Sequence, residues 1–178
     1  MKSMKVRVLA AALCVLPVAM VGQAAHAPAK HVWRTATADE LAGVLPARAQ
    51  VEKERIETEM RTATGVIDGR GRVIAAVVLI TAGYSANGKY SHYLLVQSPM
   101  KIGGDVLLQP GNYAVGWTRE TDGLLVHIYE AETGVERGTI TAHALTPPLP
   151  VVSIKVWPPS EHSVIQIGRY SLPYTPEE

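Results

Sequence analysis

An uninterrupted apolar run, Val73–Ile80, limits the fold of this chain more than any other feature of its sequence. In an extended strand alternate side chains point to opposite faces, and neither face of this run carries a polar group. An apolar strip left in water is rare on soluble monomers. We therefore expect one face to pack in the core, against Tyr113, Val115 and Trp117. The other should lie beneath a short helix at Leu41–Leu45 or in a homodimer interface.

Turn residues divide most of the remaining chain into short β-type segments. Asp68-Gly69, between Val66-Ile67 and Val73-Ile74, predicts a hairpin at this point. The turn signals recur about every 8–12 residues, a spacing typical of all-β sandwiches and barrels. Near the N-terminus, Thr37 and Glu40 have the spacing of a capping box, and Pro46 ends the apolar periodicity that follows, so we expect a short helix from about Ala38 to Leu45. The sequence predicts an antiparallel β-sandwich, or a small barrel, of about eight or nine strands with a short N-terminal helix.

The segment from Ile102 to Trp117 contains the dipeptide Pro110-Gly111 between two apolar stretches. Proline presets φ for the second position of a β-turn, and glycine supplies the positive φ that a type II turn needs next. Tyr113 follows on the face that also carries Val115. The pattern therefore predicts a hairpin with Pro110, Gly111 and Tyr113 as its structural residues.

The string from Leu108 to Val115 resembles the L-x-P-G-x-Y-x-V element of small secreted bacterial β-sandwich domains of the carboxypeptidase-regulatory-like type. The flanking Ile102-Gly103-Gly104 and Gly123–Val126 are similar to segments of exported bacterial families of unknown function. The resemblance implies a mostly non-catalytic module. The apolar run Val73–Ile80 and the N-terminal helix depart from that pattern and imply an elaborated version.

The N-terminus has the form of a secretory signal peptide over residues 1–27, with a basic start, a short apolar run and small residues before the expected cleavage region. We expect export to the periplasm or beyond the cell. The apolar run is too short for stable membrane insertion, which takes about 20 apolar residues. Cys14 lies within this segment, so the mature protein would have no thiol and no disulfide. Residues 28–50 would form a lead-in with the short helix, 51–172 the β domain, and 173–178 a loose tail.

Loss of the signal peptide would remove three of the 17 basic residues and none of the 16 acidic ones, leaving a net charge of −2. The mature chain has no basic patch with interleaved aromatic residues. We therefore expect no binding to nucleic acid.

His92, His127 and His143 all lie on predicted strands and could converge on a metal ion if their strands were neighbours on one face. No H-x-H or H-E-x-x-H motif joins any two of them. Nucleophile motifs are also missing from the sequence. The pattern therefore favours separate histidines, no cofactor and a protein that is not an enzyme, with a metal-dependent enzyme as an alternative.

Trp33 in the lead-in and Tyr84 in the loop before Asn87-Gly88 are the candidates for an exposed binding surface. Their partner would be an unknown protein, a carbohydrate or a small molecule. We expect an exported binding or structural module without catalytic activity. The second hypothesis is a lipocalin-like barrel that holds a small apolar ligand in a hollow core.

Overall fold

The computed structural model describes residues 32–81 and 89–177. The predicted signal peptide and the loop that carries Tyr84 lie outside these ranges. The elements are β1 (Arg34–Thr35), α1 (Ala38–Ala42), β2 (Arg48–Val51), β3 (Glu54–Glu57), the 3-10 turn η1 (Met60–Thr62), β4 (Thr64–Ile67), β5 (Val73–Leu79), β6 (His92–Val96), β7 (Met100–Ile102), β8 (Val106–Leu108), β9 (Gly111–Arg119), β10 (Leu124–Glu130), β11 (Glu136–Ala144), β12 (Val152–Val156), β13 (Val164–Gly168) and β14 (Tyr170–Pro176).

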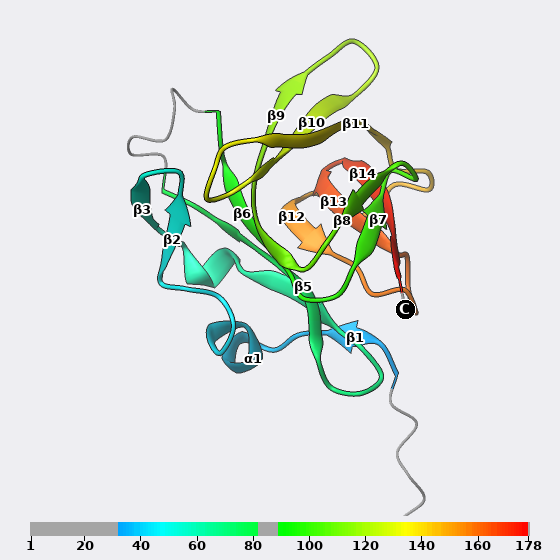
Figure 1. Cartoon of the computed structure of the whole chain (residues 1–178). Helices are drawn as coiled ribbons and strands as arrows, with labels where there is room; N and C mark the ends of the chain where they lie inside the picture. Colours follow the sequence, from blue (N-terminus) through cyan, green and yellow to red (C-terminus); the bar gives the residue numbers. More distant parts are fainter. Residues whose placement is uncertain (1–31, 82–88, 178) are drawn as a thin grey trace, which may run out of the picture.

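The prediction of an all-β fold is confirmed, but the described residues form fourteen strands rather than eight or nine. Ten strands follow one antiparallel path, β1-β4-β5-β6-β9-β10-β11-β14-β13-β12, and the β7–β8 pair extends it beside β14. The sheet curls so that β12 lies near β4, where the Val156 amide donates to the Thr64 hydroxyl at 3.4 Å (Figure 1). No strand pairing joins β12 to β4 or β5 within the described ranges, so the predicted alternative of a closed barrel is wrong.

The inner face of the curled sheet encloses a filled apolar core. At its centre ten apolar side chains surround a cavity of about 20 Å³. That volume holds about one water molecule, whereas ligand pockets measure about 300–1,000 Å³. The central cavity of the described residues is therefore much smaller than an ordinary ligand pocket. The ten residues are Val77, Leu94, Ile102, Val115, Val126, Ile128, Ile154, Ile165, Ile167 and Leu172.

The prediction that Val73–Ile80 is covered on both faces is confirmed. Val77 belongs to the inner core, which also contains Tyr113 and Val115. Val78 belongs to a second apolar layer, made with α1 and the β2–β3 hairpin. β5 has a β-bulge opposite Val66–Ile67, which changes which of its side chains point inward. As a result, Ile74 packs in the inner core beside Ala75. One chain covers this strip by itself, which removes the reason for expecting a dimer at this place.

The helix α1 is shorter than the predicted span of residues 38–45, but its start is as expected. The Thr37 hydroxyl accepts from the Glu40 amide at 3.3 Å, and the Glu40 carboxylate accepts from the Thr37 amide at 2.8 Å. Leu41 is buried against the outer layer, together with Leu45 just beyond the helix. The capping box starts the helix, and packing of Leu41 holds it on the sheet.

The predicted hairpin at Pro110-Gly111 is wrong. β8 pairs with β7, and β9 pairs with β6 and β10, so the Pro-Gly step is a corner between strands with different neighbours. Gly111 is the first residue of β9 and does not have positive φ. The positive φ values lie at Gly103 (+66°) and Gly104 (+92°), in the turn of the β7–β8 hairpin. Tyr113 fastens the corner, because its hydroxyl donates to the Gln109 carbonyl four residues upstream at 2.7 Å.

The C-terminal segment is not the loose tail expected from the sequence. β14 continues to Pro176 and pairs with β7, with Tyr174 opposite Ile102. Tyr174 is buried in the core, and its hydroxyl donates to the Trp157 carbonyl at 2.7 Å. The sequence misled here because a proline is tolerated in a strand wherever its nitrogen faces away from the partner.

Candidate functional site

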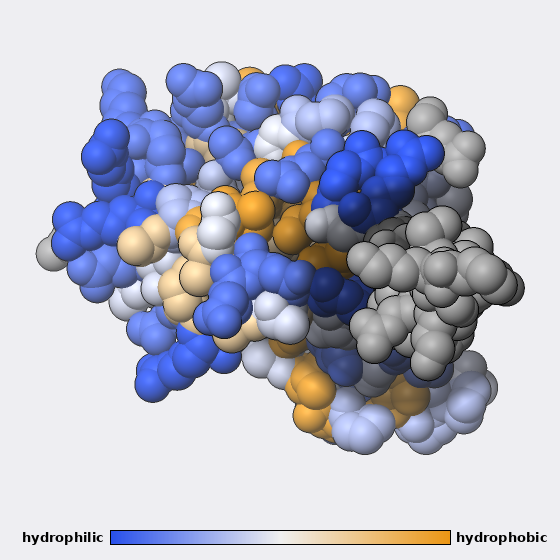
Figure 2. Space-filling model, turned by 90° about the horizontal axis from the view of Figure 1, so that it is seen from below, coloured by the Kyte–Doolittle hydropathy of each residue, from blue (hydrophilic) through white to orange (hydrophobic). Residues whose placement is uncertain are grey.

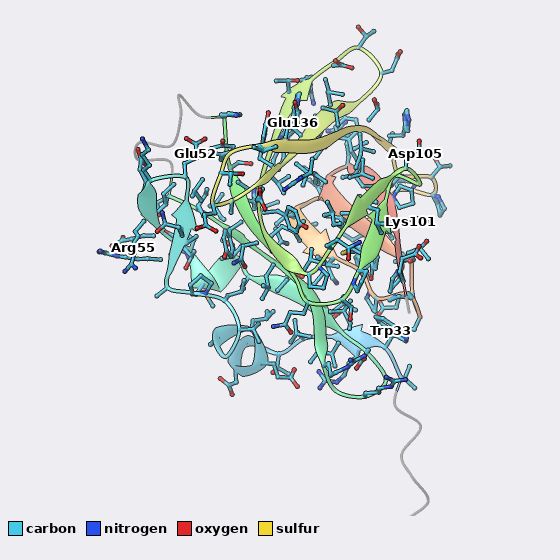
Figure 3. All side chains as sticks on the ribbon, viewed as in Figure 1. Trp33, Glu52, Arg55, Lys101, Asp105 and Glu136 are labelled. Atoms are coloured by element: carbon cyan, nitrogen blue, oxygen red, sulfur yellow. The ribbon has the colours of Figure 1, made fainter. Side chains whose placement is uncertain are left out.

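Trp33, one of the two predicted surface aromatics, lies just before β1 at one end of the curled sheet (Figure 3). Its side chain is half-buried and packs against the edge of the inner core. Its carbonyl accepts a hydrogen bond from the Ser160 hydroxyl at 2.8 Å, which ties this segment to the loop after β12. Figure 2 views the molecule from below and shows apolar side chains near the middle of the face, with hydrophilic ones above and below them.

A pocket of about 460 Å³ opens beside Trp33, and we call it the Trp33 pocket. Its volume lies within the range of small-molecule sites. Three turns or chain segments meet at it: the β4–β5 turn, the β6–β7 connection and the end of β14. The lining residues are Trp33, Asp68, Gly69, Arg70, Arg72, Ile74, Ser98, Pro99, Pro176 and Glu177.

Asp68 gives the β4–β5 turn a fixed shape. One carboxylate oxygen accepts from the Arg70 and Arg72 amides at 2.8 and 2.9 Å. The other accepts from the Arg72 guanidinium at 2.9 and 2.8 Å. Burial by itself would raise the pKa of Asp68, but these four hydrogen bonds hold it below its usual value. The turn therefore keeps a charged carboxylate at neutral pH and presents Arg70 at the pocket.

Glu177, another charged residue of the pocket lining, is held by a backbone hydrogen bond and by a side-chain ion pair. The Glu177 amide donates to the Pro99 carbonyl at 2.7 Å, and the Glu177 carboxylate pairs with Lys101 at 3.2 Å. Arg70 forms no ion pair with any residue in the described ranges. The pocket thus combines a tryptophan, a free guanidinium, a serine hydroxyl and carboxylates of fixed position. Such a set can both donate to and accept from one ligand.

The structure does not bring His92, His127 and His143 together. His92 is on the inner face of β6 with Leu94 and Val96, whereas His127 is on the outer face of β10. His143 is exposed on β11, next to the buried Ala142 of the inner core. Residues on opposite faces of a sheet cannot ligate one ion. Within residues 32–81 and 89–177, no three side chains of histidine, cysteine, aspartate or glutamate are grouped to hold a metal.

His127 and His92 have local partners instead. His127 Nδ1 lies 2.7 Å from a carboxylate oxygen of Glu136, and the imidazole stacks on Tyr129 with ring centres 6.1 Å apart. The His92 imidazole stacks on Trp117 with ring centres 5.0 Å apart, and its Nδ1 lies 3.0 Å from the Ser91 hydroxyl.

Burial makes His92 a neutral residue. Its side chain is 2% exposed, and its Nε2 is the one buried side-chain polar atom without a hydrogen-bond partner in the described part of the chain. Burial lowers the pKa of His92 to about 4. The imidazole therefore serves as packing beneath Trp117.

Sequence reasoning found Trp33 but missed the polar residues around it. Asp68 was visible only as part of a turn signal, and nothing in the sequence joined it to Ser98 or Glu177. Tyr84, the other predicted surface aromatic, lies outside the described residues. No helix in the described ranges is long and apolar enough to cross a membrane.

Comparison with known proteins gives no relative for this chain. No protein-family model matches it, and neither the curated proteins nor the solved structures contain a significant match. We therefore infer the function of the protein from the chemistry of the Trp33 pocket.

Proposed function

We propose that this protein is an exported binding module without catalytic activity that holds a carbohydrate in the Trp33 pocket. The observation that carries the proposal is a half-buried tryptophan beside polar groups of both signs, in a pocket of about 460 Å³. Export rests on the signal peptide predicted over residues 1–27. The resemblance to carboxypeptidase-regulatory-like domains agrees with such a module, but the proposal does not depend on it.

A sugar ring has the surface that this pocket would fit. Its C–H faces are apolar and pack on an aromatic ring, while its hydroxyls donate and accept hydrogen bonds at the rim. Arg70 would donate, Glu177 would accept, and Ser98 could do either. Asp68 and Glu177 are already held by hydrogen bonds and an ion pair, so the Arg70 side chain is the main group to be ordered when a ligand binds.

The test is to screen the purified protein on an array of neutral oligosaccharides and to measure the strongest binder by calorimetry. We expect Arg70→Gln to weaken binding about tenfold or more without changing the melting temperature, because this exposed side chain would lose charged hydrogen bonds to the ligand. Trp33→Leu should abolish binding. Arg169→Gln, at the opposite end of the core, is the matched control and should bind like the parent.

Two results would contradict the proposal. One is an array without a binder. The other is an oligosaccharide whose affinity is unchanged in both Arg70→Gln and Trp33→Leu, which would place the sugar elsewhere on the molecule.

A further inference from the structure

A second depression lies at the other end of the inner core, where β9, β10, β12 and the β13–β14 turn meet. Its volume is about 530 Å³, and it is more open than the Trp33 pocket. We call it the arginine groove. The lining residues are Trp117, Arg119, Leu124, Val151, Val152, Ser153, Ile167, Gly168, Arg169 and Tyr170. None of them was singled out as a binding residue from the sequence.

The charge of the arginine groove is of one sign. Arg119 and Arg169 are both exposed, and no carboxylate lines the groove. Neither arginine forms a salt bridge with any residue in the described ranges. A guanidinium nitrogen of Arg119 lies 3.5 Å from the Tyr170 hydroxyl, a weak contact that leaves its other donors available. Glu120 and Asp122 are in the neighbouring β9–β10 turn, outside the lining.

Most of the remaining lining of the groove is apolar. Leu124 and Ile167 are buried at its base. Trp117 is fixed by its stack on the buried His92 ring, with an interplanar angle of 27°. Val151 stands at the rim with 70% of its surface exposed. An apolar body placed on this wall would therefore gain contact without reorganising the protein.

The filled core limits how large that apolar body can be. Ile167 lines both the arginine groove and the central cavity of about 20 Å³. In the described part of the chain the cavity behind Ile167 is too small for a long acyl chain, so the ligand has to lie along the groove. Planar guanidinium groups suit an anion with two oxygens, such as a carboxylate.

We propose that the arginine groove binds a small organic carboxylate with an aromatic or short apolar body. The site is independent of the Trp33 pocket and of the carbohydrate proposed there. The carboxylate pairs with Arg119 and Arg169, and the apolar body packs on Trp117 beside Tyr170 and Val151.

Calorimetric titration of the purified protein with 3-phenylpropionate tests this proposal. We expect saturable binding that Arg119→Gln and Arg169→Gln each weaken about tenfold or more, since hydrogen bonds to charged groups are lost. Arg70→Gln, a matched change at the Trp33 pocket, should leave the affinity unchanged. Melting curves of all three variants check that they remain folded.

Two further ligands sharpen the test. The neutral analogue 3-phenylpropanamide should bind at least about tenfold more weakly than the acid, because it offers no charge to the arginines. Inorganic phosphate should compete poorly, because it gains nothing from Trp117. The proposal fails if 3-phenylpropionate does not bind at millimolar concentration, if the amide binds equally well, if phosphate competes as well as the acid, or if binding survives both arginine changes. None of these results would bear on carbohydrate binding at the Trp33 pocket.

Discussion

The two ends of the inner core are built on the same plan, with a half-buried tryptophan and arginine residues over an apolar base. At the Trp33 end, carboxylates balance the positive charges, through the contacts Asp68–Arg72 at 2.8 Å and Lys101–Glu177 at 3.2 Å. At the Trp117 end, Arg119 and Arg169 face a lining without a carboxylate. Of the two arginines that line the Trp33 pocket, Arg72 is paired with Asp68 and Arg70 has no ion pair in the described ranges, whereas both arginines of the arginine groove are without one there. This difference is the reason for proposing a neutral polar ligand at one end and an anion at the other.

The largest expected effect comes from removing the aromatic ring at the arginine groove. Trp117→Ala should lower the free energy of unfolding by about 3 kcal/mol, because the ring packs on the core and covers His92. Trp33→Ala should cost less, since Trp33 only borders the core. Urea denaturation of both variants measures the two losses. Equal losses would mean that the two tryptophans support the core to the same degree.

The Trp117 end should also be the acid-sensitive one. The pKa of His92 is lowered to about 4 in the folded protein, against about 6.5 for a histidine in an unfolded chain. The contribution of His92 to the free energy of unfolding is therefore fully present above pH 6.5. It is lost as the pH drops from 6.5 toward 4, because the unfolded state binds the proton more tightly. By pH 5 this histidine should account for a loss of about 2 kcal/mol.

Comparison of urea denaturation at pH 7 and pH 5 isolates this contribution. His92→Gln should lose stability at pH 7 but show a smaller difference between the two pH values. The exposed His143→Gln should keep the full difference. If His92→Gln and the parent showed the same difference, the acid sensitivity would come from other groups.

The arginines should differ in their effect on stability as well as on binding. Arg72→Gln removes two hydrogen bonds to the buried Asp68 carboxylate and should destabilise the protein by about 1 kcal/mol, a value reduced by the exposure of the guanidinium. Arg169→Gln should change the unfolding free energy by less than about 0.5 kcal/mol. Thermal denaturation compares them directly. A destabilised Arg169→Gln variant would show that this arginine has a structural partner.

The smallest effect is expected at Gly111, the first residue of β9. Its φ is not positive, and an added Cβ would make only ordinary contact with the Tyr113 ring at 3.6 Å. Gly111→Ala should therefore change stability by less than about 0.5 kcal/mol. Tyr113→Phe, which removes the hydrogen bond to Gln109, should cost about 1 kcal/mol in the same assay. The reverse order would restore the turn predicted from the Pro-Gly pair.

Local sequence patterns determined those features that depend on few residues. The capping box at Thr37 and Glu40, the β4–β5 hairpin after Ile67 and the double coverage of β5 were all correctly predicted. Each follows from capping, turn chemistry or the cost of exposing apolar surface, which act over short stretches of chain. The all-β class follows in the same way from the spacing of turns.

Only the tertiary structure decided which strands are neighbours. The same pairing decided which residues come together at the pocket and at the groove. Pro110-Gly111 has the sequence of a hairpin turn, but β8 and β9 each have better partners elsewhere in the sheet. The strand faces place His92 inside and His127 outside, which no spacing revealed. Asp68 and Glu177 meet at one pocket, and Arg119 and Arg169 at one groove, because the sheet curls until segments distant in the chain lie side by side. Long-range strand pairing is set by the packing of the whole core, and a local pattern does not encode it.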